Sequence, residues 1–290
     1  MIKEFEFLKI INSALSKNSH IGDDCAYLKD YGLVISSDAL VEDVHFSFKY
    51  MNPYEVARKA LLVNISDILA SGAKPKYALI TLSGKLTGDF IKKFYKGIND
   101  TACEFGVEII GGDLTGGDKI TISITILGDT KKRNISSRSF AKNGYILAVA
   151  GEFGSSAKGL EELKKGLKDS YFISYHKSPK LNPKIADSVS KKVRYPYAMM
   201  DASDGLVDCI YQISEKSKVK IKINSSLIPT KTDNKDYMLY GGEDYALVVA
   251  LHKDDFKKIK GLTEIGICES GSGIYIDDKI AKYKGFNHFE

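Results

Sequence analysis

The stretch LVISSDALVEDVHF, residues 33–46, combines the pattern of a buried strand with the side chains of a polar site. Its apolar start predicts a strand. We expect the strand to end in Ser36, Ser37 and Asp38, with His45 in the loop beyond. Open α/β sheets bind ligands beyond the carboxyl ends of their strands. The stretch therefore predicts an α/β fold with a ligand site at this strand end.

Length and composition predict a folded protein of two domains. The chain has 290 residues, of which 43% are hydrophobic and 27% charged, enough for a sizeable core. No apolar run reaches the roughly 18 residues of a membrane span. The opening MIKEFEFLKIINS lacks the apolar core of a signal peptide. We expect a cytoplasmic protein with no membrane partner.

The basic charge does not indicate nucleic-acid binding. The formal net charge of +5 comes mainly from scattered lysines, and the arginines are Arg58, Arg133, Arg138 and Arg194. Base and phosphate recognition relies on clustered arginine, so we expect no nucleic-acid partner. The four cysteines form no C-x-x-C pair, which argues against a disulfide framework or a zinc site.

The first half of the chain alternates predicted helices and strands. NPYE, residues 52–55, is a helix start with an Asn cap, Pro at the first position and Glu closing a capping box. This helix should reach Ser71, with Asn64, Asp67 and Ser71 on one stripe. Strands are expected over 77–84 and over 107–113, where a Gly-Gly turn ends the second, and a helix over 89–105.

A polar, aperiodic segment separates the two predicted domains. Before it, residues 119–128 alternate strictly, which predicts a strand in an antiparallel sheet or at a subunit interface. The segment 129–144 holds the expected boundary, giving domains 1–137 and 138–290. The second should be α/β or α+β, with strands in YILAVAG, VKIKIN and YALVVAL and helices over 155–165 and 254–260.

Aspartates recur at predicted strand ends and on one helix stripe. Each Asp beside Gly has a simpler interpretation as a turn or cap residue. Together they indicate a shared crevice, since three apolar strands each lead into an Asp. Clustered carboxylates need cations, and oxygen ligands without Cys or His favour Mg²⁺. The motifs are IGDDCA (Asp23, Asp24), SSD (Asp38), NISD (Asp67), GGDLTGG (Asp113) and DASDG (Asp201, Asp204).

An Asp-rich and Gly-rich crevice with Mg²⁺ suggests a nucleoside triphosphate as ligand. The backbone at Gly111 and Gly112 can approach phosphate oxygens, and Arg138 is either a phosphate contact or an ordinary surface residue. The chain contains neither the P-loop pattern, nor the protein-kinase signatures, nor a G-x-G-x-x-G turn. Any ATP site must be of another type.

Six motifs, in order, resemble those of the thiamine-monophosphate kinase family, in the aminoimidazole-ribonucleotide-synthetase superfamily of ATP users. They span about residues 21–250, and the closing KGFNHF is similar too. The motifs are IGDDCA, SSDALVEDVHF, LLVNISDILASGAKP, IIGGDLTGG, DASDGL and YGGEDYAL.

The resemblance implies a fold and a reaction. The fold would be a two-domain synthetase-like α/β (α+β) architecture whose N-terminal domain binds ATP and contributes strands to the β-barrel of a homodimer. Its C-terminal α/β domain would close the site. The reaction would be Mg²⁺-dependent transfer of phosphate from ATP to thiamine monophosphate, giving thiamine diphosphate.

The resemblance also implies roles for particular residues. The implied thiamine monophosphate contacts are His45, Glu243 and Phe286, and the implied ATP contacts are Gly112, Asp113, Arg138 and Ser203. Catalysis would fall to Asp38, Asp67, Asp113, Arg138 and Asp204. The implied metal ligands are Asp24, Ser36, Ser37, Asp38, Asp67, Asp113, Asp201 and Asp204.

Two departures and two rival functions remain at this stage. His20 stands where the family commonly has Gly, and Ala39 where Thr is frequent, both beside implied ligands. A purine-pathway synthetase of the same superfamily is the main rival. A nucleotide sensor without turnover is the other, although the complete Asp set argues against it.

Overall fold

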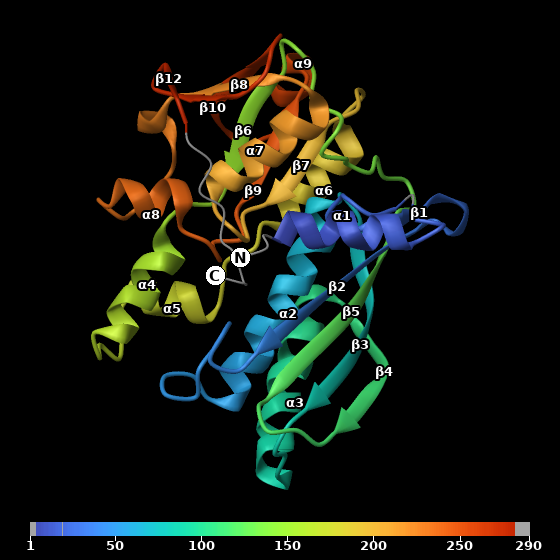
Figure 1. The fold of residues 1–290 in the computed structure, drawn as a ribbon, viewed down its shortest axis with the longest axis vertical. Coiled ribbons are helices and arrows are strands. Elements are labelled where there is room, and N and C mark those ends of the chain that lie inside the picture. The colour runs from blue at the N-terminus through green and yellow to red at the C-terminus, as the bar shows by residue number, and fades with distance from the viewer. Residues whose placement is uncertain (1–3, 19, 282–290) are drawn as a thin grey trace.

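The computed structural model describes residues 4–18 and 20–281, which form two halves, each built around a β-sheet (Figure 1). The first half contains α1 (Glu4–Ala14), β1 (Ala26–Leu28), β2 (Leu33–Val41), α2 (Pro53–Ala70), β3 (Lys74–Ser83), α3 (Gly88–Phe105), β4 (Glu108–Thr115) and β5 (Thr121–Asp129). The second contains β6 (Ile146–Ala150), α4 (Ser155–Lys164), α5 (Tyr171–Lys177), α6 (Pro183–Lys192), β7 (Ala198–Asp201), α7 (Leu206–Ser217), β8 (Lys220–Ile223), α8 (Lys235–Tyr240), β9 (Leu247–Leu251), α9 (Lys253–Phe256), β10 (Thr263–Glu269), β11 (Ile274–Ile276) and β12 (Lys279–Ile280).

Both sheets are mixed. In the described residues, the first has the strand order β1-β2-β5-β3-β4, and the second β12-β11-β8-β10-β6-β9-β7. β3 and β4 are parallel, as are β8 and β11, while the remaining neighbours are antiparallel. The α/β prediction is confirmed.

The first sheet has one covered and one open face. In β5, Ile122, Ile124 and Ile126 are buried under α2, whereas the residues between them are only partly buried. β2 and β3 continue the same alternation, so the opposite face includes the exposed Ser37 and Leu79. The antiparallel environment predicted for β5 is confirmed.

Helix α2 connects the halves. The Asn52 side chain accepts a hydrogen bond from the Glu55 N–H, and the Glu55 carboxylate accepts one from the Asn52 N–H, which confirms the predicted capping box. The helix contacts β2, β3 and β5 on one side and β7 on the other. It lies at the junction of the halves in Figure 1, so its side chains reach both.

Two predicted strand ends were wrong. β2 continues through Ser36, Ser37 and Asp38 to Val41, because polar residues in an alternating strand can face a polar neighbour without ending it. β4 likewise continues through Gly111 and Gly112 instead of turning. A Cβ at Gly112 would lie 1.8 Å from the Ile80 carbonyl oxygen, so glycine here permits close strand packing. Of the three expected strand ends, only that at Asp201 is observed.

A segment without helix or strand lies between β5 and β6, from Thr130 to Tyr145. The expected domain boundary near residue 138 lies in it and stays a prediction. One hydrophobic core crosses the junction, joining α2 side chains such as Ile65 to Met199 and Val249 of the second sheet. The helix predicted over 254–260 is shorter than expected, since α9 ends at Phe256.

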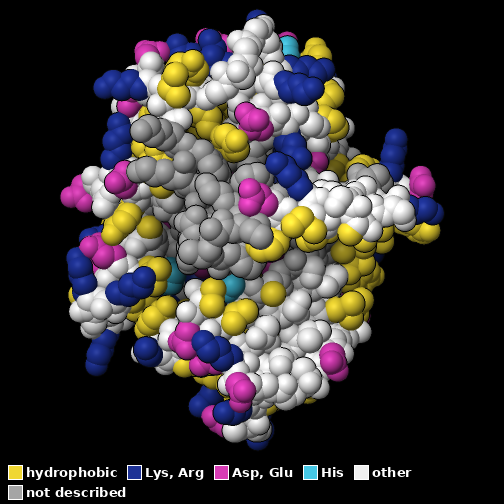
Figure 2. Space-filling model, in the orientation of Figure 1, with side chains coloured by type: hydrophobic (Ala, Val, Ile, Leu, Met, Phe, Trp, Pro, Cys, Tyr) yellow, Lys and Arg dark blue, Asp and Glu magenta, His cyan; other side chains and the backbone are white. Residues whose placement is uncertain are grey.

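Within the described part of the chain, no helix combines the length and apolar character that a membrane crossing requires. On the face shown in Figure 2, basic and acidic side chains are interspersed, without a broad patch of one sign. This distribution agrees with the scattered lysines of the sequence.

The close packing of α3 on α2 generates a stability prediction. A Cβ added at Gly97 would lie 2.4 Å from the Tyr54 carbonyl oxygen, so Gly97→Ala should push the helices apart. We expect a net loss of about 1–2 kcal/mol in the free energy of unfolding, although alanine favours helix by about 1 kcal/mol. Urea denaturation measures this change in the free energy of unfolding. Gly88→Ala in the same helix meets no atom within 4 Å and serves as control; equal stability of both variants would contradict the packing argument.

Candidate active site

Four carboxylates from both halves lie close enough together to affect one another's pKa values. Burial raises the pKa of Asp201 to about 7, and the charges of Asp24 and Asp38 raise it further. The pKa of Asp67 is raised well above its usual value, first by burial and second by repulsion from Asp201 and Asp38. Asp24 also raises the pKa of Asp38, so these charges act on one another across the two halves. The four, with their positions, are Asp24 in the loop before β1, Asp38 in β2, Asp67 in α2 and Asp201 at the end of β7.

Helix α2 and strand β2 hold two of these carboxylates. The Ser36 hydroxyl donates to Asp67 Oδ2 at 2.5 Å, and the Asp38 N–H donates to Asn64 Oδ1 at 3.2 Å. Ser71 lines a neighbouring cavity. The helix stripe predicted from the spacing of Asn64, Asp67 and Ser71 therefore faces the site region.

The side chains fit a hard divalent cation. All offer oxygen atoms as ligands, and Asp201 Oδ2 is buried with no hydrogen-bond partner in the part of the chain that the structure describes. Among residues 4–18 and 20–281, no three His, Cys, Asp or Glu side chains already form a metal cage. Mg²⁺ usually keeps waters and binds one or two carboxylates together with phosphates. The residues suit a cation that arrives with phosphate.

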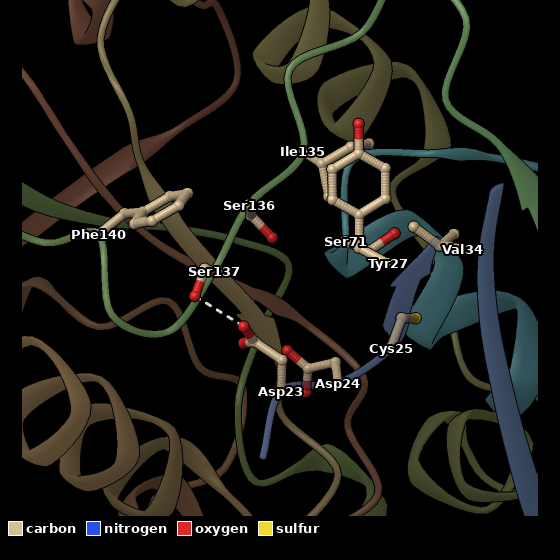
Figure 3. A pocket seen from close by; sticks show the side chains of 10 residues that line it. All are labelled: Asp23, Asp24, Cys25, Tyr27, Val34, Ser71, Ile135, Ser136, Ser137 and Phe140. Carbon is tan, nitrogen blue, oxygen red and sulfur yellow. Dashed lines mark hydrogen bonds between the residues drawn. The ribbon is translucent and has the colours of Figure 1, made fainter. Parts of the chain in front are cut away.

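Arg138 binds the loop that carries Asp24. Its Nη2 lies 2.6 Å from Asp24 Oδ1, and its backbone N–H donates to Asp23 Oδ1 at 2.9 Å. The Ser137 hydroxyl donates to Asp23 Oδ2 at 2.6 Å (Figure 3). Burial lowers the pKa of Arg138, but Asp24 and its hydrogen bond outweigh burial and raise it overall. The guanidinium stays charged.

Two adjoining cavities open beside this loop. The first, of about 140 Å³, is lined by Asp23, Asp24 and Ser137 together with apolar side chains such as Tyr27 and Phe140 (Figure 3). The second, of about 270 Å³, is more polar and includes His20, Arg138 and Lys216. His20, the departure noted in the sequence, thus borders the candidate site. Arg138 Nε is buried without a partner in the described residues.

A second polar cluster surrounds Glu243. Its carboxylate lies 2.9 Å from Lys59 Nζ and 3.4 Å from His176 Nδ1. Its backbone N–H donates to the Ser203 carbonyl oxygen at 2.6 Å, and Lys59 Nζ donates to the His45 carbonyl oxygen at 3.4 Å. The structure therefore gathers three residues implied by the sequence motifs, Ser203, His45 and Glu243.

Sequence reasoning missed Lys59 and His176, both buried. The available signal was a lysine within the apolar helix run VARKALLVN, since buried lysines almost always have partners. Asp244, the residue after Glu243, accepts hydrogen bonds from the Gly154 and Ser156 N–H groups at the start of α4. It serves as a cap for α4.

The remaining predicted site residues lie on the open sheet face, on an edge strand and in a loop. Ser37 is exposed and shares a hydrogen bond of 3.1 Å with Thr125, on the face opposite Asp38. Asp113 and Gly112 lie on β4, the edge strand, three strands from β2. Asp204 is exposed in the loop before α7. Their roles stay predictions, and Phe286 lies outside the described residues.

Comparison with known proteins places the chain among relatives of one kind. Residues 22–130 match the family model of the AIR synthase related protein, N-terminal domain. Thiamine-monophosphate kinase of Bacillus subtilis is 34% identical, with 93% of each chain covered. The enzyme of Aquifex aeolicus is 35% identical, with 99% of this chain and 98% of the relative covered.

Solved structures agree. AaThiL complexed with AMPPCP and TMP has a TM-score of 0.90 and 32% identity, covering 99% of this chain and 97% of that one. The crystal structure of tt0281 from Thermus thermophilus has a TM-score of 0.84 at 19% identity, covering 97% of this chain and 98% of that one, and shows the shared fold.

The buried carboxylates generate a pH prediction for protein freed of metal and nucleotide. Because the pKa of Asp201 is raised to about 7, its stabilising contribution is complete below its unfolded value and is lost as pH rises through about 7. Asp201→Asn should therefore raise the free energy of unfolding at pH 8 by about 1–3 kcal/mol, with little gain near pH 4.

Asp187→Asn is the matched control. Partial burial raises the pKa of Asp187, but Lys191 and Arg133 hold it below its usual value, so this change should lower stability at pH 8. Urea titrations across pH measure both. A loss of stability at pH 8 in Asp201→Asn would contradict the repulsion among the carboxylates.

Proposed function

The chain belongs to the thiamine-monophosphate kinase family, and from this we propose that the two clusters form one active site for its reaction. The enzyme transfers the γ-phosphoryl group of ATP to the phosphate of thiamine monophosphate, giving thiamine diphosphate and ADP. Asp24, Asp38, Asp67 and Asp201 would receive the polyphosphate, and the Glu243 cluster would receive the acceptor. The meeting of carboxylates from both halves of the molecule supports this proposal.

The transfer needs no side chain that removes a proton. The acceptor phosphate oxygen is largely ionised near neutral pH, since a second phosphate pKa lies at about 6. It attacks the γ-phosphorus as the bond to the β-γ bridging oxygen breaks, and ADP leaves with that electron pair. Repulsion between two polyanions is the main barrier, so positioning and charge neutralisation are the tasks of the protein. No phospho-enzyme is involved.

The carboxylates and Arg138 act on the phosphate end. Mg²⁺, when bound, would neutralise charge between carboxylates and phosphates. The carboxylates proposed first as Mg²⁺ ligands are those of Asp24, Asp38, Asp67 and Asp201. Ser36 and Asp204 lie near these residues in the chain and are further proposed ligands. Ser37 and Asp113 lie on other surfaces and would reach the ion only through an additional contact. Arg138, held by Asp24, offers a fixed positive charge to the transferring group, and Ser203 and Gly112 remain the proposed additional ATP contacts.

Glu243 and His45 act on the acceptor end. The pKa of Glu243 is lowered overall, since Lys59, His176 and His45 outweigh the effect of burial. A carboxylate of this kind attracts the cationic thiazolium ring. His45 Nδ1 accepts the Val41 N–H at 3.0 Å, which places the proton of the neutral ring on Nε2 as a donor for phosphate. Phe286 is the proposed ring contact by family position alone.

The reaction itself is tested with purified protein, ATP, Mg²⁺ and thiamine monophosphate, following thiamine diphosphate by chromatography. Product should form from the monophosphate and not from thiamine or thiamine diphosphate. Asp67→Asn should lower kcat by about a hundredfold or more without lowering the melting temperature, because asparagine can still accept from Ser36 and no longer carries a repelled charge.

Asp255→Asn is the matched control, a buried carboxylate that accepts the Arg194 and Tyr195 N–H groups. It should lower stability and leave kcat nearly unchanged. Near-normal turnover in Asp67→Asn would remove this helix carboxylate from the phosphate site.

The open face of the first sheet supports a homodimer. α2 covers one face, whereas the other presents partly exposed strand residues, including Leu79 at 38% exposure. A sheet face without a covering layer is typical of an interface. A second copy placed here would bury these residues and would add a layer against β4, which carries Asp113.

A charge on this face should disrupt the dimer. Leu79→Glu places a carboxylate in the proposed interface, and burial of an unpaired charge is costly, so we expect the monomer to predominate at micromolar concentration. Sedimentation equilibrium gives the mass. Leu167→Glu, at a leucine of 46% exposure in the second half, is the control and should leave the mass unchanged. A dimeric Leu79→Glu protein would place the interface elsewhere.

A further inference from the structure

Lys59 is fully buried in α2, between two segments that approach the acceptor end of the proposed site. Its ammonium lies 2.9 Å from Glu243 Oε1 and donates to the His45 carbonyl oxygen at 3.4 Å. Glu243 belongs to the second half of the molecule, and His45 follows β2 in the first. One cation therefore connects both implied acceptor residues across the junction.

Lys59 and Glu243 form an ion pair in which the buried ammonium depends on the carboxylate. A buried ammonium is costly unless an anion and hydrogen-bond acceptors surround it. Glu243 supplies the anion through Oε1, while its side chain remains 28% exposed. Glu243 Oε2 lies 3.4 Å from His176 Nδ1. The carboxylate is thus anchored from inside the protein by Lys59 and retains an exposed part for a ligand.

The backbone around Glu243 is also held in an unusual conformation. Glu243 has φ 64° and Tyr245 φ 52°, a left-handed region that non-glycine residues seldom adopt. The Glu243 and Tyr245 N–H groups bond the carbonyl oxygens of Ser203 and Ala202. Asp244 binds the start of α4. Such strain persists where surrounding contacts over-determine it, often in ligand sites.

We propose that Lys59 is a positioning residue for the acceptor: it fixes the Glu243 carboxylate and the His45 segment in the geometry that receives the cationic ring of thiamine monophosphate. This inference rests on the proposed function of the Glu243 cluster. Lys59 acts through Glu243 and His45, since its own ammonium is enclosed. Preorganised groups of this kind lower the cost of binding.

Several charged or titratable groups face the Glu243 carboxylate. Burial alone raises the pKa of Glu243, and its neighbours, Lys59 first among them, reverse that effect. Burial and Lys59 lower the pKa of His176 to about 3, so its imidazole is neutral at assay pH and Lys59 supplies the main positive charge. Loss of the lysine charge leaves burial less opposed, so the pKa of Glu243 should rise. The facing groups are Lys59 from α2, His176 from α5, His45 and Tyr50 from the loop after β2, and the adjacent Asp244.

The test uses the full-length enzyme in steady-state assays that vary thiamine monophosphate and ATP separately. Lys59→Met should raise the KM for thiamine monophosphate by about tenfold or more, because truncating one partner of a buried charge pair is costly, with the KM for ATP changed less than about threefold. Lys59→Arg should recover part of this loss. Lys93→Met, at an exposed lysine paired with Asp89 in α3, should change neither KM.

The pH dependence of the KM for thiamine monophosphate provides a second readout. The ratio of the thiamine monophosphate KM of Lys59→Met to that of the unmodified enzyme should increase as pH falls, because the raised pKa lets Glu243 become protonated. Taking the ratio cancels titration of the substrate phosphate. The increase should disappear when both enzymes carry Glu243→Gln. A ratio independent of pH in the glutamate background would overturn the proposed charge coupling.

A double-mutant comparison covers the case in which Lys59→Met does not fold. Lys59→Met combined with Glu243→Gln leaves no uncompensated buried charge. Its KM for thiamine monophosphate should exceed that of Glu243→Gln alone by much less than the tenfold effect of Lys59→Met in the glutamate background, because only the His45 contact remains to be lost. A much larger KM in the double variant, or equal KM changes for both substrates, would show a merely structural lysine. Unmodified protein that makes no thiamine diphosphate would overturn the proposed function itself, and this inference with it.

Discussion

Four carboxylates, one buried and three partly buried, lie close enough together that each additional negative charge among them is costly, and the fold must hold them there. They lie in a loop, a strand, a helix and a strand end from both halves, so the packing of the halves brings the charges together. Burial and repulsion raise the pKa values of Asp67 and Asp201. A cation with phosphates would relieve this repulsion, which makes ligand binding and stability parts of the same balance.

Helix α2 organises both ends of the proposed site. Asp67 faces the carboxylate cluster, and Lys59, about 12 Å earlier along the helix axis, anchors Glu243 at the acceptor end. Because one rigid helix carries both contacts, the distance between the phosphate end and the ring end is set by backbone geometry. The capping box at Asn52 and the close α3 packing at Gly97 fix that helix in place.

Strands β2 and β4 show why polar residues and glycines inside a sheet led to wrong predictions of strand ends. Ser36 and Asp38 alternate with Ser37 along β2, so two face α2 and one faces the open side. A helix that offers Asn64 and Asp67 makes such a polar strand interior stable. In β4, Gly112 removes a side chain that would strike Ile80. Polar residues and glycines were predicted to end these strands, although in the fold they pack against α2 and β3.

The sequence by itself determined the features encoded within short windows: the α2 capping box, the alternation of β5, the α/β class and the ordered Asp motifs that identify the family. Local hydrogen bonding and side-chain periodicity govern these, so neighbouring residues suffice to predict them. Only the tertiary structure decided which charges meet. The pairing of Lys59 with Glu243, the use of Asp244 as a cap for α4, and the separation of Ser37 and Asp113 from the carboxylate cluster depend on the packing of distant segments, which no local pattern records.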